Sequence, residues 1–319
     1  MDMSTYGAVR ACLPEGRTLF YYERDRYAVF LLQHLLAAGW TARALKESRF
    51  GKLLTVPCVR DYLAAIGRLD IDPEWIALVP FHDPVAWRLT LSRWGNADSH
   101  AWNQTTCKGA NLVLQLNLPE AHNRQYRQLV SPSGAQIFNY SGHPVSRNEN
   151  TLAWARMDVD LNTGEALIEE IQSDWVRAAA SALRNPRRYY DAGDGLSFPR
   201  FRTGLRRYCE EVLPRYGDGW QETMMAAVLN FIVSELGIRK IYFHEFDSGN
   251  ALKRINARYS APPRSIYTSL PRRFCYRLVE DEPRFIEQYR NRPKSKSARA
   301  RFPGELKFWL LDLESPPDA

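Results

Sequence analysis

The spacing of apolar residues changes near residue 84. It predicts helices before this point and mainly strands after it. In segment 25–40, DRYAVFLLQHLLAAGW, apolar residues recur three and four positions apart, which predicts an amphipathic helix. Segments 41–50 and 57–67 predict two further helices, with Thr41 as the N-cap of the first. We therefore predict a helical N-terminal region over residues 1–83.

Beyond residue 84, apolar and polar residues alternate, which is the pattern of half-buried strands. The alternation predicts strands over 85–94, 111–118, 151–161 and 165–172. Segment 220–237 is apolar nearly all round and predicts a buried helix that ends at Gly237.

Three further strand regions follow that helix. They are predicted at 238–246, at 265–279 as a strand pair or one long broken strand, and at 305–313. These elements together predict an α+β fold with a mixed, largely antiparallel sheet faced by helices. We expect residues 84–319 to form an α+β catalytic domain that follows the helical region.

A hairpin is predicted between segments 151–161 and 165–172, because Asn162-Thr163-Gly164 is a turn sequence. The expected register pairs Arg156 with Glu170, Trp154 with Gln172, and Asp158 with Ile168. Alternation then gives one polar face and one apolar face, with Glu169 on the apolar face. A carboxylate there needs a partner or takes a raised pKa.

The hairpin carries the strongest candidate for a catalytic site, in the stretch EALIEEIQSDW. Side chains two apart on a strand lie about 7 Å apart, so Glu170, Gln172 and Asp174 can converge on one target. The candidate catalytic residues are Glu170, Asp174, Gln172, Glu169 and Arg156. Two structural roles are the alternative: Asp174 caps the following helix, and Glu170 only pairs with Arg156.

Composition and charge favour a globular protein with an anionic partner. Hydrophobic residues make up 45% of the chain and charged residues 25%, which excludes a disordered chain. No segment predicts a membrane span or an export signal, and the five scattered cysteines have no metal-binding spacing, so we expect a cytoplasmic protein without a membrane partner. The net charge of +7 indicates a nucleic-acid partner, and we expect double-stranded DNA.

Arginines alternate with aromatic residues in the C-terminal half, a pattern that suits phosphate contacts and base stacking. The candidate DNA-binding residues are Arg187, Arg188, Arg206, Arg207, Lys253, Arg254, Arg264, Arg272 and Arg273. Segment 290–304 is polar, basic and interrupted by proline, and we expect a flexible loop there.

A second polar group follows the predicted strand 238–246. The candidate residues of this possible second site are His244, Glu245, Asp247 and Asn250. Here a helix N-terminus with Lys253 and Arg254 would bind phosphate. This strand and helix are also similar to the late part of acyl-CoA-dependent acetyltransferases, although the glycine-rich pyrophosphate loop of that family has no counterpart in the chain.

Segment 150–175 contains Glu-Ile-Gln-Ser-Asp and is preceded by a histidine-containing turn at His143. It resembles the signature of a family found in phage and mobile-element proteins. The later helix ending in Glu-Leu-Gly, followed by an Ile-Tyr-Phe strand, is similar to the second block of that family. Together the two blocks cover roughly residues 140–277. The resemblance implies a setting of conflict between phage and host more than a particular reaction.

The leading functional hypothesis is a DNA glycosylase that excises bases from phage DNA, including modified bases, in anti-phage defence. Cleavage of an N-glycosidic bond passes through an oxocarbenium-like state, which a carboxylate such as Glu170 stabilises without a metal or other cofactor. Gln172 would hold water or a sugar hydroxyl, and Arg156 would keep Glu170 ionised. The analogy to prokaryotic anti-phage glycosylases of similar size supports the hypothesis.

Two alternatives remain open. Asp160 followed by Glu170-Ile171-Gln172 is similar to the acidic metal-binding pattern of restriction-endonuclease-like nucleases, in which Asp160 and Glu170 would bind Mg²⁺. Gln172 replaces the lysine of that pattern. The alternative from another class is a non-catalytic DNA-binding module.

Overall fold

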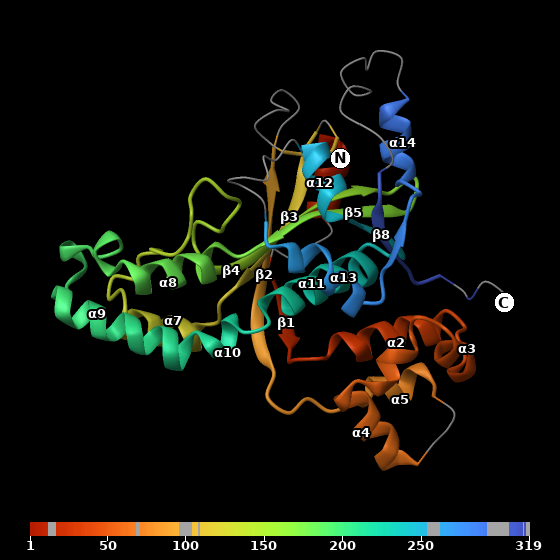
Figure 1. Cartoon of the computed structure of the whole chain (residues 1–319), viewed down its shortest axis with the longest axis horizontal. Helices are drawn as coiled ribbons and strands as arrows, with labels where there is room; N and C mark the ends of the chain where they lie inside the picture. Colours follow the sequence, from red (N-terminus) through yellow and green to blue (C-terminus); the bar gives the residue numbers. More distant parts are fainter. Residues whose placement is uncertain are drawn as a thin grey trace.

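The computed structural model describes residues 1–11, 17–67, 71–95, 104–107, 109–253, 262–291, 306–314 and 316. Within these residues an eight-stranded sheet has the order β1-β2-β3-β4-β5-β6-β8-β7. The strands are β1 (Arg17–Tyr22), β2 (Val85–Trp94), β3 (Asn111–Asn117), β4 (Thr151–Asp160), β5 (Glu165–Gln172), β6 (Lys240–His244), β7 (Arg277–Val279) and β8 (Phe308–Asp312). The predicted α+β fold with a mixed, largely antiparallel sheet is confirmed (Figure 1).

All neighbouring strands are antiparallel except β5 and β6, which pair in parallel from Glu165 with Lys240 to Ile168 with Phe243. A parallel pair needs a crossover connection, and the helices between β5 and β6 supply it. The parallel pairing stops at Ile168, although β5 continues to Gln172. Among the described strands, the last residues of β5 therefore pair only with β4.

Helices lie in the N-terminal region, between β3 and β6, and between β6 and β8. The N-terminal region contains α1 (Met3–Ala11), α2 (Tyr27–Ala37), α3 (Ala42–Glu47), the 3₁₀ helix η2 (Gly51–Thr55), α4 (Pro57–Ile66) and α5 (Pro73–Ala77). Between β3 and β6 lie α7 (Glu120–Leu129), α8 (Asp174–Arg184), η3 (Pro186–Arg188), η4 (Ala192–Asp194), α9 (Phe198–Arg207), the π-helix η5 (Tyr208–Val212), α10 (Pro214–Gly217), α11 (Trp220–Asn230) and the π-helix η6 (Phe231–Glu235). The C-terminal helices are α12 (Phe246–Lys253), η7 (Arg264–Tyr267), α13 (Ser269–Arg273) and α14 (Arg284–Arg290).

One face of the sheet, which we call the α11 face, packs against the predicted buried helix. α11 contacts β3, β4 and β5, and its Met224 and Met225 have no exposed surface. On the sheet side, Met157 of β4 and Ile168 of β5 belong to the same apolar cluster. Because α11 is apolar nearly all round, it is covered on its outer side as well, by α2 among other elements.

The opposite face, which we call the Arg156 face, is mixed in character. Near β6 and β8 it is apolar, and Leu167, Tyr242 and Phe308 pack there against α12 and α14. Along β4 and the end of β5 it is polar. The helices α7 to α10 form a lobe at the left of the molecule in Figure 1, and α2 to α5 lie at its lower right.

The helical prediction for residues 1–83 missed one strand. The helices at 25–40, 41–50 and 57–67 are present, and Thr41 caps α3 through a hydrogen bond from the Ala44 amide. However, Arg17–Tyr22 forms β1, the edge strand beside β2. Six residues are too few to show a clear period, so pairing with β2 decides their conformation.

The prediction of strands over 265–279 is wrong for most of that segment. It forms η7 and α13, and only Arg277–Val279 is a strand. Pro271 has no amide hydrogen to donate to a sheet, and the side chains of Thr268 and Ser269 instead bond to carbonyls four residues before them.

Candidate functional site

A β-bulge in β5 sets the geometry of the candidate site. Arg156 pairs with Glu170 and Trp154 with Gln172, as predicted, but Met157 pairs with Ile168 and Asp158 with Leu167. Glu169 is therefore an extra residue without a partner on β4. The predicted pairing of Asp158 with Ile168 is wrong for this reason.

The bulge brings two consecutive carboxylates to the same face. Glu169 bonds to His244, which lies on the Arg156 face two residues beyond Tyr242. The predicted position of Glu169 on the apolar face is thus also wrong, because regular alternation does not hold across a bulge. The side chains of Glu169 and Glu170 both belong to the polar part of the Arg156 face.

Glu169 is fully buried and fully bonded. Its Oε1 accepts from the Thr106 amide at 2.9 Å, and its Oε2 accepts from the Thr106 hydroxyl at 2.7 Å and lies 3.0 Å from Nε2 of His244. Burial opposes ionisation, but the hydrogen bond from His244 and the charges of Lys253 and Arg156 outweigh it, so the pKa of Glu169 falls to about 2. Glu169 is an ionised carboxylate that holds the structure together.

Lys253 completes this buried group. Its Nζ donates to the carbonyl oxygen of Glu169 at 2.6 Å, and its side chain is buried. Burial lowers the pKa of Lys253, against the opposing charges of Glu170 and Glu169. The Lys253 side chain thus binds the backbone of the bulge, and this predicted DNA-binding residue is buried rather than exposed on the surface.

Glu170 is held differently, and one of its oxygens is available. Its Oε2 accepts from Nη2 of Arg156 at 2.5 Å and from Nε at 3.2 Å. No residue in the described part of the chain hydrogen bonds to Oε1, and the residue keeps 9% of its surface exposed. Burial alone would raise the pKa of Glu170, but the charges of Arg156 and Lys253 have the larger effect, and the net pKa is lowered. The carboxylate is therefore ionised at neutral pH.

Asp174 receives four donors and is not a helix cap. Ser173 caps α8 by accepting from the Val176 amide, which corrects the predicted capping role of Asp174. The donors to the Asp174 carboxylate are Nδ1 of His143 at 2.9 Å, Nε2 of Gln172 at 2.8 Å, Nε1 of Trp154 at 3.0 Å, and a guanidinium nitrogen of Arg177. Burial opposes ionisation of Asp174, but the bonds from His143 and Trp154 lower its pKa.

The bond to Asp174 orients His143. Nδ1 of His143 lies 2.9 Å from both oxygens of Asp174 and also 2.9 Å from Nε2 of Gln172. A carboxylate only accepts hydrogen bonds and the Gln172 amide donates to Asp174, so we assign the imidazole proton to Nδ1. No residue that the structure describes bonds to Nε2 of His143, and the side chain is 28% exposed. This is the arrangement of a general base whose orientation is fixed by a buried carboxylate.

An open hollow lies beside these groups. It holds about 2420 Å³ of empty space, including the part open to solvent, and lies over β2 and β3 next to α1 and the loop before β4. His143 and Trp94 both line it. The guanidinium carbon of Arg156 lies over the ring of Trp94, 5.6 Å from the ring centroid. Asp174 therefore contacts His143, which lines the hollow. Glu170 contacts Arg156, which packs against Trp94 in the wall of the hollow.

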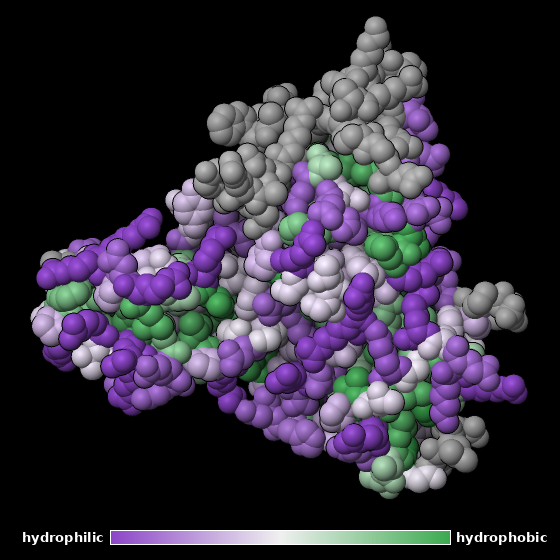
Figure 2. Space-filling view, in the orientation of Figure 1, coloured by the Kyte–Doolittle hydropathy of each residue, from purple (hydrophilic) through white to green (hydrophobic). Residues whose placement is uncertain are grey.

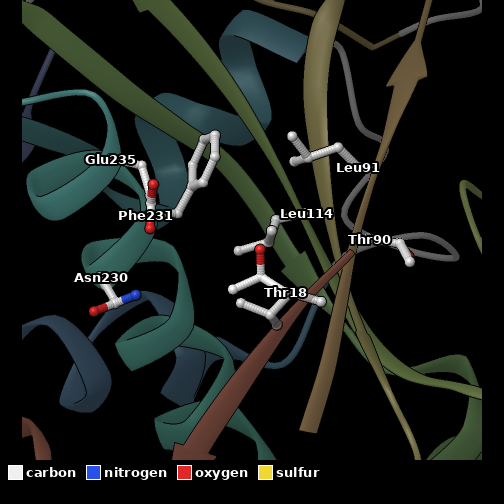
Figure 3. A pocket seen from close by; sticks show the side chains of 8 residues that line it. Thr18, Thr90, Leu91, Leu114, Asn230, Phe231 and Glu235 are labelled. Carbon is white, nitrogen blue, oxygen red and sulfur yellow. The ribbon is translucent and has the colours of Figure 1, made fainter. Parts of the chain in front are cut away.

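A smaller hollow on the α11 face does not involve any predicted site residue. It holds about 340 Å³ and lies between the sheet and the end of α11, where Leu114 and Phe231 approach each other (Figure 3). Its lining is mainly apolar, with Asn230 and Glu235 beside it. We place the candidate chemistry on the Arg156 face.

The predicted second site is not a separate site. His244 is fully buried against Glu169, and Glu245 accepts from the amides of Asp247 and Ser248 at the start of α12. Asp247 is exposed and pairs with Arg264 at 3.2 Å. The side chain of Asn250 on α12 makes no hydrogen bond to another described residue, and Arg254 lies outside the described residues.

The predicted DNA-binding arginines are spread over several surfaces, and many have acidic partners. Arg206 and Arg207 pair with Glu210 and Glu211 one helical turn away. Arg273 is partly buried between Asp25 and Glu222 and holds α13 to the rest of the molecule.

The other predicted arginines contact aromatic rings or lie on the lobe. Arg187 lies over Phe198 and Arg272 over Trp309. Arg188 is in η3 of the α7–α10 lobe, whose surface is largely hydrophilic in Figure 2. These arginines do not form one continuous basic surface around the candidate site.

The predicted metal ligands Asp160 and Glu170 are not brought together. Asp160 pairs with Glu165 at the far end of the hairpin, and its Oδ1 accepts from the turn amides of Asn162 and Thr163. Their partners on β4, Asp160 for Glu165 and Arg156 for Glu170, are four positions apart, roughly 13 Å along the strand. Among the described residues, no group of three or more His, Cys, Asp and Glu side chains could hold a metal ion.

The sequence did not show how several residues of the site come together. His143 precedes the hairpin in an irregular loop, and Thr106 lies in a short described stretch before β3, so no period connects them to β5. Trp94 and Trp154 are strand residues whose roles depend on which strands are neighbours. The only signal in the sequence was the histidine-containing turn that precedes the Glu-Ile-Gln-Ser-Asp segment.

Comparisons of the chain with protein-family models, with curated proteins and with solved structures found no match. In addition, no helix of the described chain is long and apolar enough to cross a membrane. The functional argument therefore depends on the geometry of the Arg156 face.

Proposed function

We propose that this protein is a hydrolase that acts on DNA, and specifically a DNA glycosylase. The observation that carries the proposal is the state of Glu170: an ionised carboxylate with one oxygen held by Arg156 and the other available. A carboxylate fixed in this way can stabilise an oxocarbenium-like state at C1′ of a nucleotide. The adjacent His143, oriented by Asp174, supports the proposal because it can accept a proton from water.

The proposed reaction is a hydrolysis in which atoms and charges balance. The bond between C1′ and the base nitrogen breaks, and its electron pair leaves with the base. Water attacks C1′ and loses one proton to His143, which then protonates the departing base. Glu170 carries the negative charge that faces the developing positive charge on the sugar, and Gln172 keeps Asp174 in place through its amide.

The proposed substrate is phage DNA, including DNA with modified bases, and the proposed setting is anti-phage defence. This part of the proposal depends on the resemblance of residues 150–175 to a phage and mobile-element family. We propose a cytoplasmic location for the same reason, since phage DNA is encountered there.

Base release from DNA tests the proposal directly. Purified protein is incubated with modified and with unmodified phage DNA in the presence of EDTA, and released bases are measured by mass spectrometry. We expect released base and alkali-labile abasic sites. In Glu170→Gln, base release should fall by about 100-fold or more, because the amide keeps the shape of the side chain but not its charge.

Asp160→Asn is the matched control on the same hairpin. It removes a carboxylate that lies far from Glu170, so base release should stay near the wild-type rate. The opposite result, in which Asp160→Asn abolishes an activity that produces direct strand breaks and is stopped by EDTA, would establish the nuclease instead. DNA binding without any base release or strand break would establish the non-catalytic module.

A further inference from the structure

Three arginines that line the hollow have no acidic partner in the described part of the chain. They are Arg10 of α1, Arg93 of β2 and Arg147 of the loop before β4, and all three are exposed. Within the described ranges, the guanidinium of Arg93 contacts the sulfur of Met3 and the ring of Tyr6. Uncompensated guanidinium groups around a concave surface create a positive potential that attracts a polyanion.

The rest of the lining mixes polar and apolar residues and contains one large aromatic ring, and its one carboxylate among the described residues, Glu149, pairs with Arg88. Gln115, Asn139 and Asn148 contribute amides, and Trp94 is half-buried in the wall. Pockets for small molecules are typically enclosed and mainly apolar, whereas this hollow is wide and open. Exposed arginines combined with an aromatic platform are instead typical of surfaces that bind single-stranded nucleic acid.

We infer that the hollow is a binding site for a single-stranded segment of DNA, with phosphates on Arg10, Arg93 and Arg147 and one base against Trp94. The inference deepens the proposed function and rests on it for the choice of DNA over other polyanions. It places a nucleotide next to the Arg156–Glu170 pair, since Arg156 lies against the ring of Trp94.

The position of Trp94 favours a single strand over an intact duplex. Because this ring is half-buried in the wall of the hollow, a base can stack on it only after leaving the stack of a double helix. A duplex substrate would therefore have to present a flipped or unpaired nucleotide. A single strand would enter without that cost.

Binding measurements test the inference without any need for catalysis. A fluorescently labelled oligothymidine and a duplex of the same length are titrated with the full chain, and anisotropy is measured at several salt concentrations. We expect tighter binding of the single strand. In Arg10→Gln/Arg93→Gln/Arg147→Gln, the slope of log K against log[salt] should become shallower by about 2, because each phosphate contact on a single strand contributes about 0.7.

Two further variants separate the hollow from other basic surfaces. Trp94→Leu should weaken single-strand binding roughly 5- to 150-fold, while Trp94→Phe, which keeps a ring, should weaken it less. Arg206→Gln/Arg207→Gln is the matched control, because these arginines pair with Glu210 and Glu211 on the lobe. Its binding and salt slope should match the wild type. Thermal unfolding confirms that each variant is folded.

The outcomes distinguish this inference from the proposed function. If the hollow variant binds like the wild type while the Arg206/Arg207 variant loses binding, or if duplex binds as tightly as the single strand, the inference is overturned. If wild-type protein binds the single strand through the hollow but releases no base, the glycosylase proposal fails and the binding site remains.

Discussion

Glu169 is an ionised side chain without exposed surface, and its contribution to stability depends on pH. Its pKa falls from 4.5 to about 2 in the folded protein. A carboxylate whose folded pKa is lowered stabilises the fold above its unfolded pKa, and this stabilisation is lost as the pH falls towards the folded pKa. The free energy of unfolding should therefore decrease between about pH 5 and pH 2, with Glu169 contributing on the order of 3 kcal/mol.

Comparison with Glu169→Gln isolates this contribution from those of Glu170 and Asp174, whose pKa values are also lowered. We expect the wild type to lose more stability than Glu169→Gln over this pH range, measured by urea unfolding. Parallel pH profiles for the two proteins would contradict this expectation, because they would show that the pKa of Glu169 is the same in the folded and unfolded states.

Asp174 sets the orientation of His143, and an amide at this position should change it. In Asp174→Asn the side chain can donate to Nδ1 of His143, so the imidazole proton is expected to move to Nε2. Base release should fall by about 100-fold or more, because His143 then has no exposed basic nitrogen. ¹⁵N-resolved NMR of the imidazole reports the tautomer independently of activity.

Trp154→Phe provides the control for this effect. It removes one donor to Asp174 but keeps the carboxylate and its bond to His143. The tautomer should remain that of the wild type, and the loss of activity should be several times smaller. An unchanged tautomer in Asp174→Asn would contradict the proposed role of the pair.

Substitution of glycine by alanine should have opposite effects on stability in two helices, α9 and α1. A Cβ at Gly204 of α9 would lie 1.9 Å from the carbonyl oxygen of Leu129, so Gly204→Ala must push α9 away from α7. We expect this variant to be destabilised by roughly 1–3 kcal/mol. Gly7 of α1 has open space around it and an ordinary helical position, so Gly7→Ala should be stabilising by roughly 0.5–1 kcal/mol.

Thermal or urea unfolding of the two variants measures both effects under the same conditions. Equal changes of the same sign would mean that α7 and α9 are not in close contact. The comparison is informative because both substitutions add one methyl group to a helix.

The helices and strands with a long, regular period could be predicted from the sequence, and the irregular ones could not. Strands β2 to β5 and helix α11 follow the predicted ranges closely, because alternation or continuous apolar character extends over many residues. The hairpin register was correct from Trp154 to Arg156 and failed beyond the bulge. A bulge leaves no mark in the alternation of apolar residues when polar side chains occupy it, as at Glu169 and Glu170.

The residues of the candidate site divide in the same way. The pairing of Glu170 with Arg156 could be predicted, because it depends on the hairpin alone. By contrast, His143 and Thr106 depend on loops whose path is set by tertiary contacts, and Ser173 was not distinguished from Asp174 as a cap because both residue types serve in that position.

At the scale of the whole molecule, residues 1–83 and the remaining chain share one sheet and one apolar core. β1 pairs with β2, and Leu31 and Leu35 of α2 belong to the same cluster as the residues of α11. Arg273 adds an ion-pair link to Asp25 and Glu222. We expect a single unfolding transition, seen at the same urea concentration by tryptophan fluorescence and by circular dichroism.

Two separate transitions, or a folded protein after deletion of residues 1–83, would contradict this expectation. The deletion removes the edge strand and exposes apolar residues of α11, so we expect it to yield aggregated protein.

Total charge could be read from the sequence, but the location of the unpaired arginines could not, since it depends on which of them find acidic neighbours in the folded chain.

The extra residue in β5 also restricts which changes of length this hairpin can accept. Removal of Glu169 would restore strict alternation and leave Leu167 and Glu170 on the Arg156 face, but Thr106 and His244 would lose the carboxylate that they contact. Removal of Ala166 would instead shift Leu167 to the α11 face, so a deletion in this stretch disturbs either the buried polar group or the apolar packing. A library of one-residue deletions across 160–175 should therefore show its strongest intolerance at these positions and the greatest tolerance in the turn 161–164.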